Sequence, residues 1–137
     1  MKKIGCLLLL VLLTGCNIAG GSYPYAEVYE INVPESDLIK EIEEFKSENP
    51  EYIVPAEVGL IDGRSERKDD HWYHIYFYYK KENQIVYTWL RPSGEGKTSF
   101  AIVSINNGLQ LGNWKEINHD FSPGDNALEK RNLKSRF

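Results

Sequence analysis

Acids and histidines near the middle of the chain are the residues best suited to chemistry. Asp69, Asp70, His71 and His74 lie within six positions, and imidazole and carboxylate groups bind metals and transfer protons. The histidines lie in a predicted strand, where residues three apart point to opposite faces of the sheet. Only a break in the strand at Trp72 would let them share an ion. We therefore predict no metal site and no cofactor.

A second candidate is the stretch RPSGEGKT, Arg91–Thr98, which is similar to a phosphate-binding P-loop. That motif needs glycine where Arg91 stands, and it joins a strand to a helix. Here the stretch joins two predicted strands, so we interpret it as a glycine-containing hairpin loop. The chain also has neither the GxSxG nor the HExxH motif. We predict no catalytic residue, and a binding protein is favoured over an enzyme.

The segment HWYHIYFYYK, His71–Lys80, places six aromatic rings in ten positions. It begins a series of three predicted strands, followed by Gln84–Arg91 and Thr98–Asn106. Short connections favour an antiparallel meander. A two-residue turn at Glu82–Asn83 would place Tyr76 opposite Trp89, Tyr78 opposite Tyr87, and His74 opposite Arg91.

This register gives the predicted sheet two different faces. One face should receive a helix and carries Tyr73, Ile75, Phe77, Tyr79, Val86, Leu90, Ala101 and Val103. The other is rich in amphipathic rings and carries Trp72, His74, Tyr76, Tyr78, Tyr87, Trp89, Arg91, Phe100 and Ile102. A turn longer by one residue would exchange the faces, because a one-residue slip inverts every side chain.

The ring-rich face has two interpretations. It is a second core if the C-terminal segment covers it with Leu109, Leu111, Trp114, Ile117 and Phe121. Otherwise it binds a partner, because Tyr and Trp combine an apolar body with a hydrogen-bonding end. The candidate partner-binding residues are Trp72, His74, Tyr76, Tyr78, Tyr87, Trp89 and Arg91.

A helix is predicted before these strands. After a strand in Tyr25–Val33, apolar residues recur at helical spacing from Leu38 to Phe45, with charged residues between them. The stretch Ser47–Pro50 should end this helix, since the residue before proline avoids helical angles. The predicted fold is α+β: an antiparallel, mostly meander sheet with one amphipathic helix packed on one face.

The N-terminus carries a different signal. Two lysines precede an apolar run from Ile4 to Leu13, which is too short to span a bilayer. The residues Leu13-Thr14-Gly15-Cys16 resemble the lipobox of bacterial lipoprotein precursors, a resemblance confined to the first 17 residues. It implies cleavage before Cys16 and a diacylglycerol anchor on its sulfur. Asn17, where inner-membrane lipoproteins of enteric-type bacteria have Asp, implies the outer membrane if the organism has one.

These expectations divide the chain into a signal peptide (1–15), a lipidated tether (16–24), a single α+β domain (25–122) and a basic tail (123–137). Cleavage would remove 15 residues with both lysines, leaving 14 basic and 20 acidic side chains, a net charge of −6. Such acidity disfavours nucleic acid. The tail, with four basic residues from Lys130 to Arg136, could form a short helix with Leu128 and Leu133 as weak apolar contacts, and could touch anionic lipid headgroups or an acidic partner. We favour a frayed terminus.

The predicted function is that of a membrane-anchored envelope lipoprotein that binds or assembles with a protein partner. An immunity or inhibitor lipoprotein is a special case. The alternative is an envelope glycan-binding or glycan-processing enzyme, with a sugar stacked on Trp72, Tyr76 and Trp89. A deep pocket with converging carboxylates would favour the enzyme.

Overall fold

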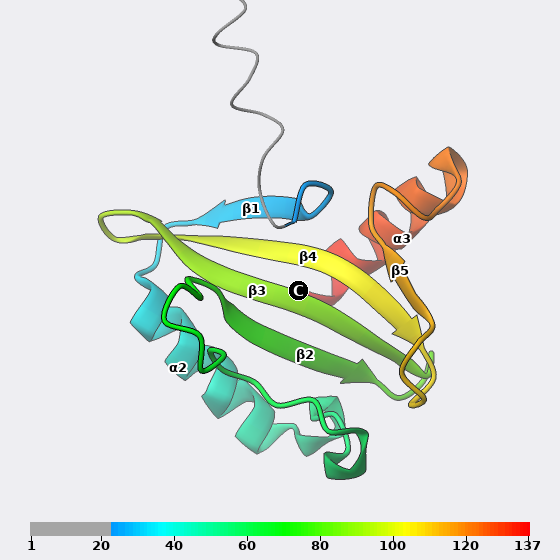
Figure 1. The fold of residues 1–137 in the computed structure, drawn as a ribbon, viewed down its shortest axis with the longest axis horizontal. Helices are drawn as coiled ribbons and strands as arrows, with labels where there is room; N and C mark the ends of the chain where they lie inside the picture. Colours follow the sequence, from blue (N-terminus) through cyan, green and yellow to red (C-terminus); the bar gives the residue numbers. More distant parts are fainter. Residues whose placement is uncertain (1–22) are drawn as a thin grey trace, which may run out of the picture.

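The computed structural model describes residues 23–137, which form an antiparallel sheet with helices packed against it (Figure 1). The elements in chain order are β1 (Glu27–Ile31), α2 (Glu35–Glu48), the 3-10 turns η2 (Pro50–Tyr52) and η3 (Ala56–Val58), β2 (Tyr73–Tyr79), β3 (Gln84–Gly94), β4 (Lys97–Asn107), β5 (Trp114–Glu116) and α3 (Pro123–Arg136). The predicted signal peptide and Cys16 lie outside the described residues. From residue 23 onward, no helix combines the length and apolarity needed to span a membrane.

The predicted α+β fold with an antiparallel sheet is confirmed. Strands β2, β3 and β4 form a meander, and β1 pairs with the other edge of β4, giving the order β1-β4-β3-β2 (Figure 1). The short strand β5 pairs with β4 along Ser104–Asn106, beyond the stretch paired with β1. Both β1 and β5 therefore complete the same side of β4.

The predicted turn between β2 and β3 is wrong by two residues. The turn contains four residues, Lys80–Asn83, and Asn83 has φ 51. Tyr76 therefore pairs with Tyr87, and His74 pairs with Trp89. Because the side-chain period of a strand is two, this shift leaves each residue on its predicted face.

The predicted connection between β3 and β4 is also wrong, and here the consequence is larger. The strands continue to Gly94 and from Lys97, with Gly96 at φ 65 in a two-residue turn. Pro92 lies inside β3 beyond Leu90, where β2 no longer pairs, so that β3 has a neighbouring strand, β4, on one side only. Proline is tolerated in such edge positions. Trp89 pairs with Ala101, whereas a loop over residues 92–97, as predicted, would place it opposite Phe100.

This one-residue slip exchanges the faces of β4. Phe100 and Ile102 lie in the core beneath the helices, whereas Ala101 and Val103 lie on the opposite face. A bulge then changes the pairing, since Thr88 pairs with Ile102 but Tyr87 pairs with Ser104. The bulge returns Ile105 to the same core as Ile102.

We call the side of the sheet that carries the helices the helix face. Apolar side chains of α2, namely Leu38, Ile39 and Ile42, pack here, and Leu133 of α3 is fully buried in the same core. The ring of Phe137 lies 5.2 Å from those of Phe77 and Phe100. The expectation of a frayed C-terminus is therefore wrong: the tail is a helix that completes the core. Figure 1 shows α3 crossing behind β4.

The C-terminal segment covers the opposite side, which we call the ring face, only at one end. There the side chain of Asn106 is fully buried and bonds to Gly108, Gln110 and Asn113. Ile117 and Phe121 turn to the helix face, and Leu109 and Leu111 are exposed. Only Trp114 reaches the rings, with its centroid 6.3 Å from that of Tyr87. A second, smaller core of Trp89, Ala101 and Val103 does form on this face, but the residues packed against it are Tyr23, Ala26, Trp72 and Tyr87 rather than the predicted C-terminal ones.

Replacing Leu133 with Ala should lower the free energy of unfolding by about 2–5 kcal/mol, because it leaves a cavity among fully buried side chains. Leu128→Ala is the matched control, since Leu128 lies on the same helix but is 47% exposed. Urea unfolding followed by circular dichroism measures both. Equal effects of the two substitutions would mean that α3 does not belong to the core.

Candidate functional site

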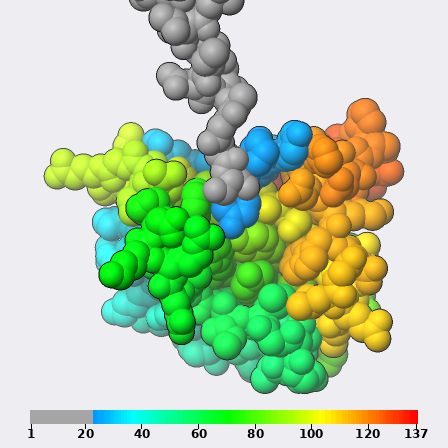
Figure 2. All heavy atoms as spheres, viewed as in Figure 1, coloured from blue at the N-terminus to red at the C-terminus, as the bar shows by residue number. Residues whose placement is uncertain are grey.

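A loop formed by residues 62–70, the edge loop, runs beside β2 and satisfies its outer edge. Gly63 and His74 exchange two backbone hydrogen bonds of 2.9 Å. The amide of Tyr76 donates to Asp62 Oδ1 at 2.9 Å, and Lys46 Nζ donates to the Tyr76 carbonyl at 2.5 Å. These bonds cap an edge that would otherwise be open to pairing. They also fix the loop beside the ring face, where it stands out in green in Figure 2.

An ion pair between a nearly buried lysine and a partly exposed aspartate anchors the start of this loop. Lys46, on α2, is 7% exposed, and its Nζ lies 2.5 Å from Asp62 Oδ2 and 4.8 Å from the centroid of the Phe77 ring. Burial lowers the pKa of Lys46, and the attraction of Asp62 opposes that shift. Because a buried charge without a partner is costly, the pair ties α2, β2 and the edge loop together.

The other end of the loop begins a chain of side-chain hydrogen bonds. Asp70 Oδ2 lies 3.0 Å from His74 Nε2, and His74 Nδ1 lies 2.6 Å from the Tyr87 hydroxyl. That hydroxyl lies 2.9 Å from the hydroxyl of Tyr23. Four residues from the N-terminal stretch, the edge loop, β2 and β3 are thus joined in series.

In this series of hydrogen bonds, the acceptor at one end determines which atom donates in each bond. The Asp70 carboxylate only accepts, so His74 Nε2 carries the proton there. In the neutral imidazole, Nδ1 then accepts from the Tyr87 O–H, and the Tyr23 O–H donates to the Tyr87 oxygen. Every hydroxyl and ring nitrogen of the chain has a partner in this arrangement.

The ionisation of its members favours a fixed structure over a proton-transfer device. Hydrogen bonds from Ser65 hold the pKa of Asp70 well below its usual range against the effect of burial, and bonds from His74 and the Trp72 amide add to them. Burial, with the Tyr23 hydrogen bond, raises the pKa of Tyr87 far above the ordinary tyrosine value. Tyr87 therefore keeps its proton and is a poor nucleophile or base.

Aromatic rings pack around this series of hydrogen bonds. The ring of Tyr23 lies 5.3 Å from Trp72, 5.9 Å from Trp89 and 6.1 Å from Tyr87, measured between centroids. Tyr76 stacks on Tyr87 at 5.0 Å with the planes 20° apart. Edge-to-face and offset contacts of this kind stabilise the fold by more than the burial of their apolar area alone.

Two adjoining hollows open between these rings and the edge loop, and we call them together the ring-face groove. Their volumes are about 470 and 410 Å³. The residues that line one or both are Tyr23, Ile61, Gly63, Arg64, Ser65, Arg67, Asp69, Asp70, Trp72, His74, Tyr76 and Tyr87. Figure 2 shows the first described residues, in blue, between the green loop and the orange segment.

The structure brings together four of the seven predicted partner-binding residues. Trp72, His74, Tyr76 and Tyr87 line the groove and are half-buried. The other three lie elsewhere. Trp89 is 7% exposed and lies beneath Tyr23 and Trp72, the Arg91 guanidinium lies 5.8 Å from the Trp72 ring centre, and the Tyr78 hydroxyl donates to Asn83.

Sequence reasoning missed Tyr23 and the edge loop as parts of this site. Tyr23 falls in the stretch assigned to the tether, although two tyrosines in close succession there (Tyr23 and Tyr25 of YPY) could have indicated packing. The stretch from Asp62 reads only as a polar loop, because nothing local indicates that Gly63 will pair with His74. Asp70 and His74 were considered as metal ligands but not as partners in a hydrogen bond.

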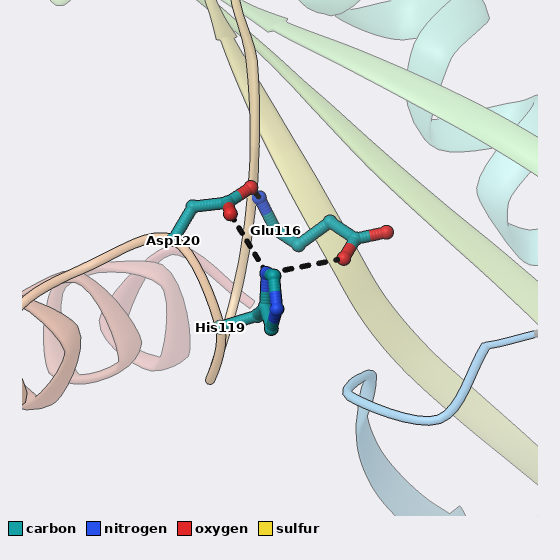
Figure 3. Close-up of side chains that lie close together, drawn as sticks. All are labelled: Glu116, His119 and Asp120. Carbon is teal, nitrogen blue, oxygen red and sulfur yellow. Dashed lines mark hydrogen bonds and ion pairs between the residues drawn. The ribbon is translucent and has the colours of Figure 1, made fainter.

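A second cluster of titratable groups lies after β5 (Figure 3). His119 Nδ1 lies 2.8 Å from Asp120 Oδ1 and 3.8 Å from Glu116 Oε2. The other Asp120 oxygen accepts the Glu116 amide at 2.8 Å, so this carboxylate caps the turn. All three residues are exposed, and the local hydrogen bonds account for their arrangement. This group includes neither His71, which lies before the start of β2, nor His74.

Comparison of the chain with protein-family models, curated proteins and solved structures found no match. The groove offers aromatic faces for stacking and hydrogen-bonding groups at its rim. Two carboxylates line it, but Asp69 is bound to Arg67 at 3.0 Å and Asp70 is held by three donors.

Asp70 should make the protein acid-sensitive. A carboxylate whose pKa is lowered on folding contributes stability above its unfolded pKa and loses it as the pH falls. We expect the free energy of unfolding of the wild type to decrease below about pH 4, and Asp70→Asn to flatten that decrease while costing about 1–3 kcal/mol at neutral pH. Urea unfolding across this pH range measures both. Glu66→Gln, in the same loop, is the control, and an unchanged slope in Asp70→Asn would contradict the assignment.

Proposed function

We propose that this chain is a membrane-anchored lipoprotein of the bacterial cell envelope whose domain binds a protein partner through the ring-face groove. The proposal includes a lipid on Cys16, which precedes the described residues. The observation that carries the binding function is the half-exposed aromatic lining of the groove. Trp72, Tyr76 and Tyr87 contribute rings there, and no helix of residues 23–137 covers them. Aromatic side chains of this kind are enriched at protein interfaces.

The groove is also preformed, since its side chains are held in place without a partner. The edge loop is tied to β2 by Asp62 and Gly63, and the ring of Tyr87 is fixed by His74 and Tyr23. A partner that binds side chains already held in place loses less conformational entropy on binding. A preformed surface suits an assembly module or an immunity or inhibitor lipoprotein.

The alternative, a glycan-processing enzyme, has less support. Glycoside hydrolysis needs two carboxylic groups facing one ligand, one of which has a raised pKa. In the groove, the pKa values of Asp69 and Asp70 are both lowered, the first by Arg67 and the second by Ser65. Trp89, one of the three rings expected to stack on a sugar, is buried.

We further propose the outer membrane as the location in an organism that has one, since Asn17 follows the lipidated cysteine. The acidic mature chain, with a net charge of −6 after loss of both N-terminal lysines, supports a partner other than nucleic acid.

A cross-linked pull-down from native membranes tests the binding function. We expect a partner that is recovered with the wild type to be reduced at least about tenfold with Trp72→Ser/Tyr76→Ser, because loss of two interface rings typically costs more than 1.4 kcal/mol. Tyr78→Ser is the matched control, since Tyr78 shares the strand and the face but lies outside the groove. With all variants folded by circular dichroism, equal recovery from the double variant would locate binding elsewhere.

A further inference from the structure

Tyr23 is the first described residue, and the domain holds it in place. Its hydroxyl bonds to Tyr87, its ring contacts Trp72 and Trp89, and its carbonyl accepts the Ala26 amide at 3.4 Å. Within residues 23–137, the chain therefore first meets the domain at the ring-face groove. Tyr23 itself lines both hollows of the groove.

The distance from this point to the proposed anchor is short. Six residues separate Cys16 from Tyr23. Even fully extended, the seven steps between them span at most about 25 Å. The point where Tyr23 is held cannot lie further than this from the lipid headgroups.

We infer that Tyr23 acts as a clasp that turns the ring-face groove toward the bilayer, and that the groove's partner is a protein embedded in that same membrane. The inference rests on the proposed lipid anchor at Cys16. We call the segment between Cys16 and the first residue held by the domain the leash. Without the Tyr23 contacts, the leash would extend as far as β1 and would be about four residues, or about 14 Å, longer. The clasp thus sets both the height of the groove and its direction.

Charge favours an embedded protein over the lipid surface as the occupant. The edge loop carries three basic and four acidic side chains. Two of the basic ones are engaged, Arg64 by Glu35 and Arg67 by Asp69. Attraction to anionic headgroups needs a cluster of uncompensated lysine or arginine.

A group of basic side chains lies on α3, namely Lys130, Arg131 and Lys134, of which Lys130 is paired with Glu27. This helix packs on the helix face, opposite the groove (Figure 1). Attraction to an anionic bilayer would turn α3 to the membrane and the groove away from it. The two orientations are therefore opposite and can be distinguished.

The test uses the full lipidated chain, reconstituted into phosphatidylcholine vesicles that contain a headgroup nitroxide lipid as quencher. A fluorophore is attached to Lys68→Cys in the edge loop or to Leu128→Cys on α3, both of which are exposed positions. We expect the Lys68 probe to be quenched roughly twofold or more relative to the Leu128 probe, because the leash holds its side of the domain near the headgroups. Equal quenching, or stronger quenching at Leu128, would overturn the orientation.

Two variants test the clasp itself. Tyr23→Ala should reduce the difference between the probes, and Tyr23→Phe, which keeps the ring, should reduce it less. If Tyr23→Ala does not fold, eight Gly-Ser residues inserted between Gly21 and Ser22 lengthen the leash without a change in the domain. A difference that survives the insertion would contradict control by the leash.

The anchor and the partner are tested separately. Labelling by a fatty-acid analogue should be lost in Cys16→Ser, and absence of label from the wild type would overturn the anchor and with it the inference. A photo-cross-linker at Lys68 in native membranes should capture a protein that mass spectrometry identifies as having a membrane-spanning segment. Capture of a soluble protein, with the groove facing the bilayer, would overturn the partner but not the orientation.

Discussion

The hydroxyl group of Tyr87 is the point on which the ring face depends. It lies in a strand at the middle of the sheet, accepts one hydrogen bond and donates another, and so connects the N-terminal stretch at Tyr23 to His74 and Asp70. Asp70 in turn holds the amides of Ser65 and Trp72, which shape the end of the edge loop. One buried phenol thereby positions two segments that the backbone alone would leave apart. Its raised pKa keeps the donor in place at all ordinary pH values.

The two faces of the sheet are stabilised in different ways. The helix face buries aliphatic and aromatic side chains under α2 and α3, as in any two-layer α+β domain. The ring face has no helix over it and relies on rings that cover one another and on side chains with a hydrogen-bonding end. A face built from amphipathic rings tolerates partial exposure, because the polar groups of Tyr and Trp can form hydrogen bonds with water. This is why a groove can stay open there without the cost of a bare apolar patch.

Alternation in β2 and β3 was enough to predict their faces, because the error in that turn was an even number of residues. The same reasoning failed for β4, where Pro92 and Gly96 decide the turn and a one-residue slip exchanges Ala101 with Phe100. The basic C-terminus has few apolar residues, a pattern that favours a frayed end. The side chain of Leu133 is nevertheless fully buried in the core. The edge loop could not be predicted, since the bonds of Asp62 and Gly63 are made to residues more than ten positions away. Local pattern thus predicted the layers, whereas the site depends on long-range polar contacts.

Hydrogen exchange of Tyr87→Phe tests the central role of this hydroxyl most directly. The substitution keeps the ring and removes only the group shared by Tyr23 and His74. The account predicts faster exchange of the Ser65 and Trp72 amides, while the amides between β3 and β4 keep the exchange rates of the wild type. Unchanged protection at Ser65 and Trp72 would mean that the edge loop is held without the hydrogen-bond chain, and would contradict the account.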